Sequence, residues 1–532
     1  MNIGQQIIRF LDKKHMTFLL ISLFVVFIGT RAAIINYSGA FTPFWDEWDG
    51  EAAFLLRRYI HGELTIGDLL RPFSEHIILF TRLVTLAIFN ISGYWDVVLQ
   101  MIANAIINAA TVVGISFALS RVLRGGWAQT AMILCTLVNA IPVSGDSILM
   151  GFHTQFYFLL TFSFASLWFL ANGRAWSLRW AAGVLCAVAS YLCMASGALT
   201  FAAAMGLHLS QMACGRKGGL REWLGVSALA AATVLAVSMV PHVPGTEVYR
   251  PHSLIQFLSA FLALASWPAP AVLGLLMVLP STLFCLRTFA DRPALSDARW
   301  FNVAAFGWIL TQLVVLAAGR GAAPIANRYF QLLLIGVAIN LTSVFWLLGW
   351  ILRSHAIGGQ RKIWASLALA AWLAIGAASL AHQERHLPSY FSYRRQIAEV
   401  QTRNVRGYLA TGDASYLAGA PGVGIPYPVS SRLREVLDMP EIRAALPPQL
   451  LSREAPRNWV EAFKRIFLDH GFVWLGSGVL LLIVTIAFGR HASAEEDIHG
   501  PEPAERSERR RPNVSRFPIW ASVRAIFRAE RR

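Results

Sequence analysis

Long apolar runs recur from one end of this 532-residue sequence to the other, and few charges interrupt them. Hydrophobic residues make up 56% of the chain and charged residues 14%, a balance typical of integral membrane proteins. A helix that crosses a bilayer needs roughly 20 apolar residues. The sequence therefore predicts an all-α polytopic membrane protein with about twelve transmembrane helices, near residues 16–36, 95–120, 127–143, 153–171, 178–194, 196–213, 223–241, 269–288, 300–318, 329–351, 363–381 and 471–489.

The basic residues predict an orientation, because Lys and Arg collect in the cytoplasmic loops of membrane proteins. Alternate connections are basic, which places both termini in the cytoplasm of an inner (plasma) membrane protein and the loop 37–94 outside. The net charge of +16 then reflects those loops, and no nucleic-acid partner is expected. This orientation requires the apolar stretch 76–93, which carries Arg82, to lie along the outer interface instead of spanning. If it spanned, every later loop would be inverted.

Four parts follow from this pattern: a membrane core at 1–381, an extracytoplasmic segment at 382–470, a last span at 471–489 and a basic cytoplasmic tail at 490–532. The first span has the features of an uncleaved signal anchor. The tail ends in a pattern typical of a membrane-surface helix around 519–528, or else it is a disordered basic tail. All five cysteines fall in or near spans, so the outer segments are expected to contain no disulfide.

An acidic cluster opens the first outer loop, where Asp46, Glu47 and Asp49 follow the first span directly. Carboxylates beside a bilayer are costly unless they bind a ligand or take part in chemistry. Glu75 and His76 begin the next surface stretch, and we expect both groups to face one cleft above the membrane core. Desolvation raises the pKa of such a carboxylate and suits it to act as a general base.

Two other interpretations of the same residues stay open. Carboxylates with a histidine are also ligands for a divalent cation such as Mg²⁺ or Mn²⁺, so Asp49, Glu75 and His76 could hold a metal or the acceptor. Alternatively, Trp45 and Trp48 are membrane-interface anchors, and the neighbouring aspartates only cap a helix.

A second candidate set lies between the ninth and tenth predicted spans, where Arg320, Arg328 and Tyr329 stand on the outer side against the charge trend. Arginine binds phosphate in fork geometry, so these residues are candidates for a phosphate site. Arginines that extend toward lipid headgroups are the alternative. A third polar set, near another outer turn, could line a substrate path: Asp146, His153, Gln155 and Tyr157.

The first loop resembles that of the GT-C superfamily of membrane glycosyltransferases, above all the protein O-mannosyltransferase and lipid A aminoarabinose-transferase type. Those enzymes open this loop with an acidic pair, and a histidine motif leading an interfacial helix follows about thirty residues later. The matching residues are Asp46-Glu47 and His76-Ile77-Ile78-Leu79, followed by the helix before the second span. The resemblance covers roughly residues 1–120 in pattern and the rest in topology.

The resemblance implies a sugar carried on polyprenyl phosphate and a single inverting displacement onto a lipid, polysaccharide or protein acceptor outside the membrane. It implies that Asp46 is the base, that Glu47 supports it and that Arg320 and Arg328 hold the donor phosphate. Two other classes remain. Polysaccharide polymerases or O-antigen ligases also have a large late outer loop, and a transporter or flippase would place ionisable groups at mid-membrane.

Overall fold

The computed structural model describes residues 3–498 except residue 356, and the side chains of residues 14–487 except 356. Every regular element within these residues is helical, and extended pairing is limited to two isolated bridges. The predicted surface helix at 519–528 lies outside the described residues. The all-helical class predicted from the sequence is confirmed for the part that the structure describes.

Eight helical stretches of the described chain are long and apolar enough to cross a membrane, or nine if the bent pair α20–α21 counts as one span. This is fewer than the twelve or so that the apolar runs predicted. The eight candidates are α1 (Ile3–Ser38, apolar from Lys14), α5 (Val97–Ser120), η2 with α8 (Gly151–His153 and Thr154–Asn172), α11 (Leu220–Ser238), η5 with α13 (Ala271–Leu273 and Gly274–Asp291), α14 (Arg299–Arg320), η6 with α15 (Asn327–Tyr329 and Phe330–Arg353) and α16 with α17 (Gly359–Glu384 and Leu387–Thr411).

Three predicted spans form helices of only 16 residues each: α6 (Gly125–Ala140), α9 (Leu178–Cys193) and α10 (Ala198–Ala213). A helix of that length extends about 24 Å, whereas the hydrocarbon core is about 30 Å thick. Each helix ends before the apolar sequence does, and the remaining apolar residues form turns. One such turn is η3 (Ala195–Gly197), where a Cβ on Gly197 would lie 2.2 Å from the carbonyl oxygen of Ser190.

Two apolar helices are shorter still. The sequence analysis missed α12 (Leu254–Ser266), and it predicted α4 (Leu79–Ser92) as a helix that does not span. Arg82 of α4 is buried, and its guanidinium donates hydrogen bonds of 2.5–3.2 Å to four backbone carbonyls. All four carbonyls belong to residues that precede α4, so Arg82 holds the loop before this helix in place. The four residues are Asp68, Leu69, Arg71 and Ile77.

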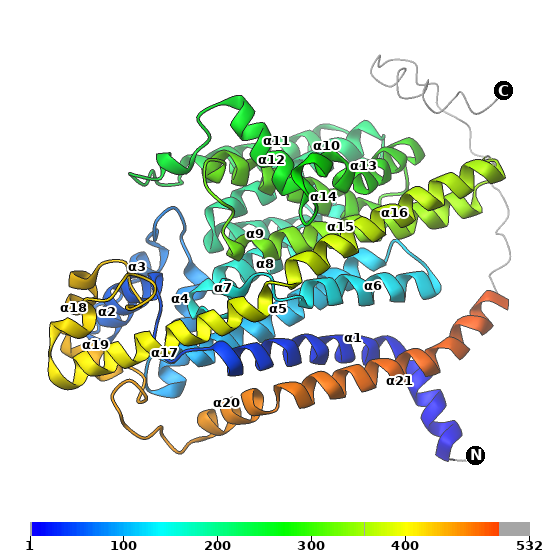
Figure 1. Ribbon diagram of the computed structural model, residues 1–532. Coiled ribbons are helices and arrows are strands. Elements are labelled where there is room, and N and C mark those ends of the chain that lie inside the picture. Colours follow the sequence, from blue (N-terminus) through cyan, green and yellow to red (C-terminus); the bar gives the residue numbers. More distant parts are fainter. Residues whose placement is uncertain (1–2, 356, 499–532) are drawn as a thin grey trace.

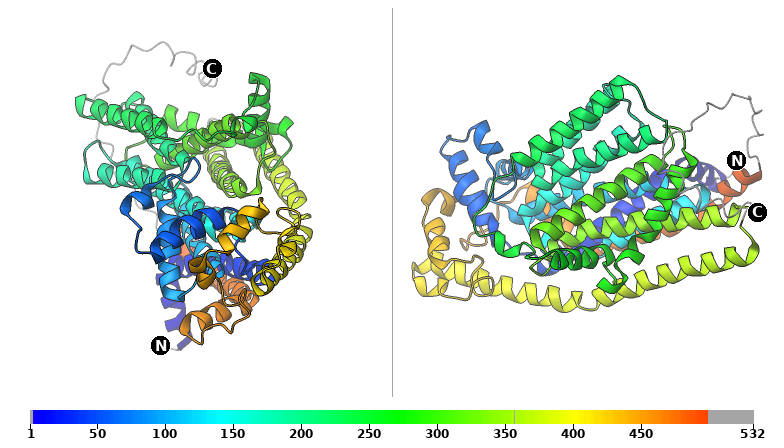
Figure 2. Two further views of the ribbon diagram at one scale, coloured as in Figure 1. Left: turned by 90° about the vertical axis from the view of Figure 1, so that its left-hand side faces the viewer. Right: turned by 90° about the horizontal axis from the view of Figure 1, so that it is seen from above.

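The long helices lie side by side, and the first loop and residues 412–458 gather at one end of the bundle (Figure 1). The start of α1 and the far part of α21 (Gly471–Ile498) lie at the opposite end. The two segments predicted to be extracytoplasmic are therefore together. Helices α16 and α17 follow one another along the side of the bundle and carry the chain to that end (Figure 2).

The two segments at that end share one hydrophobic core, and we call residues 40–78 and 387–458 together the cap. Trp48, in the wide π-type helix η1 (Trp48–Leu56), is fully buried and packs edge-on against Trp95, with ring centroids 5.4 Å apart. It is therefore not a membrane-interface anchor. The remaining cap helices are α2 (Arg57–Ile60), α3 (Ile66–Leu70), η7 (Ala414–Leu417), α18 (Ser430–Leu437) and α19 (Pro440–Ala445).

The last span is held against the first by small residues. A Cβ on Gly29 would lie 2.3 Å from the backbone nitrogen of Leu475, and one on Gly478 would lie 2.6 Å from that of Val26. Only glycine permits this approach of two helices, a device common in membrane helix pairs. Before the bend, α20 (Trp459–Asp469) is fixed by buried Lys464, whose ammonium lies 2.6 Å from the carboxylate of Asp96.

Candidate functional site

Asp46 lies on a turn between α1 and η1 that the second half of the cap holds in place. Its neighbour Trp45 has a left-handed backbone (φ 57°) and donates its amide to the carbonyl of Pro426 at 2.8 Å. Such strain concentrates at functional sites. Burial raises the pKa of Asp46, nearby Arg328 lowers it and Asp49 raises it further. The carboxylate is half-buried and accepts no hydrogen bond from the described residues, so it is free to meet a ligand.

Glu47 points the other way, into the protein. Its carboxylate is buried and accepts hydrogen bonds from the backbone amides of Phe44 at 2.6 Å and Phe152 at 3.2 Å. Burial, with the nearby carboxylate of Glu51, raises the pKa of Glu47 to about 8. Glu47 precedes η1 but makes no side-chain capping bond to it. It ties the first loop to the start of the span that follows η2.

Glu51 is a residue that the sequence analysis did not select. It lies in η1, is buried, and accepts hydrogen bonds from the side chains of Thr85 at 2.7 Å, Trp95 at 2.7 Å and Gln100 at 3.0 Å. Burial raises the pKa of Glu51, and those hydrogen bonds oppose the shift. Its position directly after the acidic cluster was the only sign in the sequence that Glu51 belongs with those carboxylates. Glu51 is also the first residue of the mostly apolar stretch that forms the rest of η1, which hides this sign.

Asp49 belongs to the cap interface. Its carboxylate receives hydrogen bonds from the phenol of Tyr427 and, at 2.9 Å, from the guanidinium of Arg432. Both partners come from the second half of the cap. Asp49 therefore joins the two segments of the cap and caps no helix.

Glu75 and His76 form a second strained turn, because Ser74 and Ile78 on either side both have φ near 53°. Burial pushes the pKa of Glu75 upward, but the hydrogen bond from Ser74 and the charges of His76 and Arg320 outweigh it, so the pKa is lowered. Burial lowers the pKa of His76. The Nδ1 atom of His76 accepts a 3.4 Å hydrogen bond from the amide of Ala195, and His76 lines the cavity described next.

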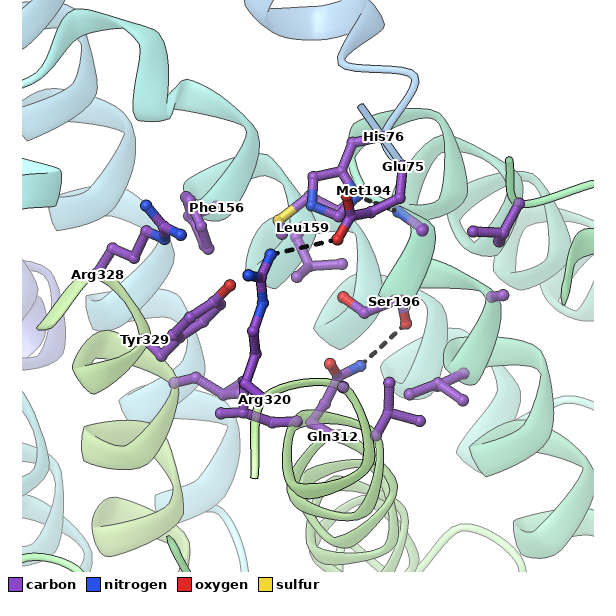
Figure 3. Close-up of a pocket in the computed structure, with 18 of the residues that line it drawn as sticks. Glu75, His76, Phe156, Leu159, Met194, Ser196, Gln312, Arg320, Arg328 and Tyr329 are labelled. Carbon is purple, nitrogen blue, oxygen red and sulfur yellow. Dashed lines mark hydrogen bonds and ion pairs between the residues drawn. The ribbon is translucent and has the colours of Figure 1, made fainter. Parts of the chain in front are cut away.

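A cavity of about 440 Å³ lies beside this turn, within the helical bundle (Figure 3). Most of its lining is apolar and comes from α8, α10, α11 and α14. Its polar groups gather around Glu75, His76, Arg320 and Arg328. The structure thus brings Glu75 and His76 to the arginines, whereas Glu47 and Asp49 are directed elsewhere. The expected single cleft for both acidic groups is not formed by these side chains.

Arg320, Arg328 and Tyr329 form a wall between this cavity and a second one of about 460 Å³, and they line both. The guanidinium of Arg320 lies 3.4 Å from the carboxylate of Glu75 and 4.8 Å from the ring centroid of Tyr249, in η4 (Glu247–Tyr249). Among the described residues Arg328 forms no ion pair at contact distance, although it is close enough to Asp46 to lower the pKa of that carboxyl group. Arg328 therefore connects the cavities to the acidic turn.

Two members of the third polar set lie beside Arg328. Asp146, in α7 (Gly145–Ile148), accepts a 2.6 Å hydrogen bond from Tyr390 of α17. His153 is only 3% exposed, and its Nδ1 atom has no partner within the described residues. No sequence pattern predicts the role of Tyr390.

The other two members of that set are structural, because their partners are intramolecular. The amide oxygen of Gln155 accepts from Thr81 at 2.9 Å, and the phenol of Tyr157 donates to the carbonyl of Ser147 at 2.8 Å.

No group of three or more His, Cys, Asp or Glu side chains that could hold a metal ion occurs in the part of the chain that the structure describes. The acidic residues near the site are instead divided among separate partners. What the arrangement offers is an apolar hollow, two arginines and one half-buried carboxylate within electrostatic reach of Arg328. Such a set suits an amphipathic ligand with an anionic group.

No protein family model matches this chain, and no curated protein matches it.

Proposed function

We propose that this chain is a membrane glycosyltransferase that moves a sugar from a polyprenyl-phosphate donor to a lipid, polysaccharide or protein acceptor at the cap side of the membrane. One observation carries the proposal: the apolar cavity ends at Arg320 and Arg328, and Arg328 lies near the half-buried carboxylate of Asp46. A prenyl chain needs an apolar hollow, its phosphate needs cations, and the acceptor hydroxyl needs a base.

The transfer requires one displacement at the anomeric carbon. The acceptor oxygen forms the new bond to that carbon while its proton passes to Asp46, and the bond from carbon to the phosphate oxygen breaks. The electron pair of that bond leaves with polyprenyl phosphate, whose growing negative charge Arg328 and Arg320 stabilise. Attack from the face opposite the phosphate inverts the configuration.

Glu75 gives Arg320 a partner when no donor is bound. Its lowered pKa keeps the carboxylate ionised, so the pair with Arg320 holds the guanidinium at the cavity wall. A bound phosphate would compete with Glu75 for Arg320. His76 lines the same cavity, and because its Nδ1 atom accepts from Ala195, the neutral ring carries its proton on Nε2 and can donate a hydrogen bond to the bound donor.

The test is transfer from a polyprenyl-phosphate sugar by the purified chain in lipid. Asp46→Asn is nearly isosteric and should lower transfer by about 100- to 10,000-fold, the usual contribution of a general base. The matched control is Asp469→Asn, an exposed aspartate at the end of α20. Full activity of Asp46→Asn with this donor would exclude Asp46 as the base. Transfer only from diphosphate-linked glycans, unaffected by Asp46→Asn, would instead identify a polymerase or ligase.

A further inference from the structure

A hollow of about 740 Å³ lies outside the site just described, between the end of α1, the middle and later turns of α17 and the start of α21. It shares no lining residue with the two cavities beside Arg328. We call it the α17 groove. Nothing in the glycosyltransferase proposal uses it.

One face of α17 makes the groove basic. Arg395, Arg403 and Arg406 line it, and the only acidic lining residue is Glu399. Glu399 pairs with Arg395 at 3.0 Å, while Arg406 donates to the carbonyl of Gln449 at 2.6 Å. Arg403 is exposed, and its side chain has no hydrogen bond or ion pair with other described residues. The groove therefore carries positive charge that the protein itself does not neutralise.

The register of α1 against α17 gives the groove a membrane end and a water end. Tyr37, in the last turn of the first span, lies beneath Arg395, whose guanidinium is 5.2 Å from its ring centroid. Farther along, after α1 has ended, Thr42 hydrogen-bonds to Thr402 at 2.7 Å. Phe472, at the start of the last span, is 78% exposed and lines the same groove. Exposed aromatic rings thus mark the lipid end, and Arg403 and Arg406 lie beyond them.

We propose that the α17 groove binds the phosphate headgroup of an anionic membrane lipid whose acyl chains pass beside Tyr37 and Phe472. Two observations favour a lipid over a free anion. The groove begins at the ends of two spans, where headgroups lie, and aromatic side chains that favour the membrane interface stand at its entrance. Unneutralised arginines at the level beyond them recognise phosphate by charge-assisted hydrogen bonds.

The experiment measures phosphatidylglycerol binding to the purified full chain by native mass spectrometry, with phosphatidylcholine as the neutral lipid. Phosphatidylglycerol should bind to the unmodified chain more tightly than phosphatidylcholine. The double variant Arg403→Gln/Arg406→Gln should weaken phosphatidylglycerol binding by about tenfold or more, because two charge-assisted contacts are lost. The single variant Arg403→Gln should weaken phosphatidylglycerol binding less. This variant removes no hydrogen bond or ion pair between described residues.

The matched control is Arg453→Gln/Arg457→Gln, which removes the same charge from exposed arginines in the loop before α20. Its phosphatidylglycerol affinity should equal that of the unmodified chain. Equal loss in the control and the groove variants would show attraction by net charge and overturn the proposal. Full displacement of the lipid by inorganic phosphate would make the groove a free-anion site, and equal binding of the two lipids would overturn headgroup recognition. None of these results depends on transferase activity.

Discussion

Carboxylates only a few residues apart in the first loop meet opposite surroundings. Beneath η1, Glu47 and Glu51 are buried and supplied with hydrogen-bond donors from three other helical elements. At the cavity side, Asp46 and Glu75 are half-buried, and Asp46 has no donor at all among the described residues. Satisfied carboxylates hold a fold together, whereas an unsatisfied one beside an arginine is available to a ligand. The acidic cluster therefore divides into a structural half and a half that is open to chemistry.

The largest expected effect tests the structural half. Glu51→Leu would leave the buried indole N–H of Trp95 without an acceptor, and it would take one acceptor from both Thr85 and Gln100, which each keep a second one. An orphaned buried donor costs about 1–3 kcal/mol, so we expect a loss of roughly 1–3 kcal/mol in the free energy of unfolding. Thermal unfolding in detergent measures it.

The free energy of unfolding should also be measured for a variant of Asp46, the carboxylate that is open to a ligand. Asp46→Asn should change the free energy of unfolding by no more than about 0.5 kcal/mol, as a surface substitution does. Similar destabilisation by both variants would break the division between the two halves.

A second prediction concerns the arginine nearest the open carboxylate. Arg328→Lys keeps the charge but loses the fork, so on the proposed function transfer should fall by roughly 10- to 150-fold. Arg320→Lys should have a smaller effect, since Arg320 already has Glu75 as a partner. The control is Arg250→Lys, an exposed arginine directly after η4. Wild-type transfer by both lysine variants at matched protein levels would mean that these arginines do not hold the donor phosphate.

The pH dependence of stability sharpens the comparison further. The pKa of Glu47 is about 8 in the folded protein and 4.5 without burial, so the folded state binds its proton more tightly. Stability from this group is complete below pH 4.5 and falls as the pH rises to 8, by at most about 1.4 kcal/mol per pH unit. Glu47→Gln should flatten the decline in melting temperature over that range. An unchanged slope in this variant would assign the decline to other groups.

The smallest effect on stability is expected from single cysteine substitutions at exposed positions. Labelling of these cysteines tests on which side of the membrane the two halves of the cap lie. Cysteines at Glu63 and Ser415, both exposed in the cap, should react with a membrane-impermeant maleimide added to intact cells. One at Gly218, exposed at the opposite end, should react only after permeabilisation. Reaction at Gly218 in intact cells would reverse the orientation.

The sequence predicts the helical class and the helix positions well, because apolar composition is a local property. It overestimates the number of spans, because the apolar sequence does not stop where the helices stop. Ile141 and Met194, for example, directly follow the last residues of α6 and α9 and have non-helical backbone conformations. It identifies Asp46, Glu75 and both arginines as site candidates through charges in unusual places. The partners Glu51 and Tyr390 escape it, because their roles depend on residues more than thirty positions away.

The cap could not be predicted for the same reason. Trp48 looks like an interface anchor in the sequence, and only contact with side chains such as Val405 and Leu433 makes it a core residue. Similarly, Asp49 gains its meaning from Arg432. Pairings between residues more than 350 positions apart leave no periodic or compositional trace.

The shared core of the cap sets an order of events during biosynthesis. The ribosome delivers Trp48 and its neighbours long before Val405, Leu433 and Leu446, which complete their burial. Until those residues emerge, the aromatic surface of the first loop is uncovered and Asp49 lacks Arg432. A nascent chain stopped before the second half of the cap would therefore display a hydrophobic surface that quality-control chaperones and proteases recognise. Closure of the cap by its last-made part would be the step that separates a finished molecule from an incomplete one.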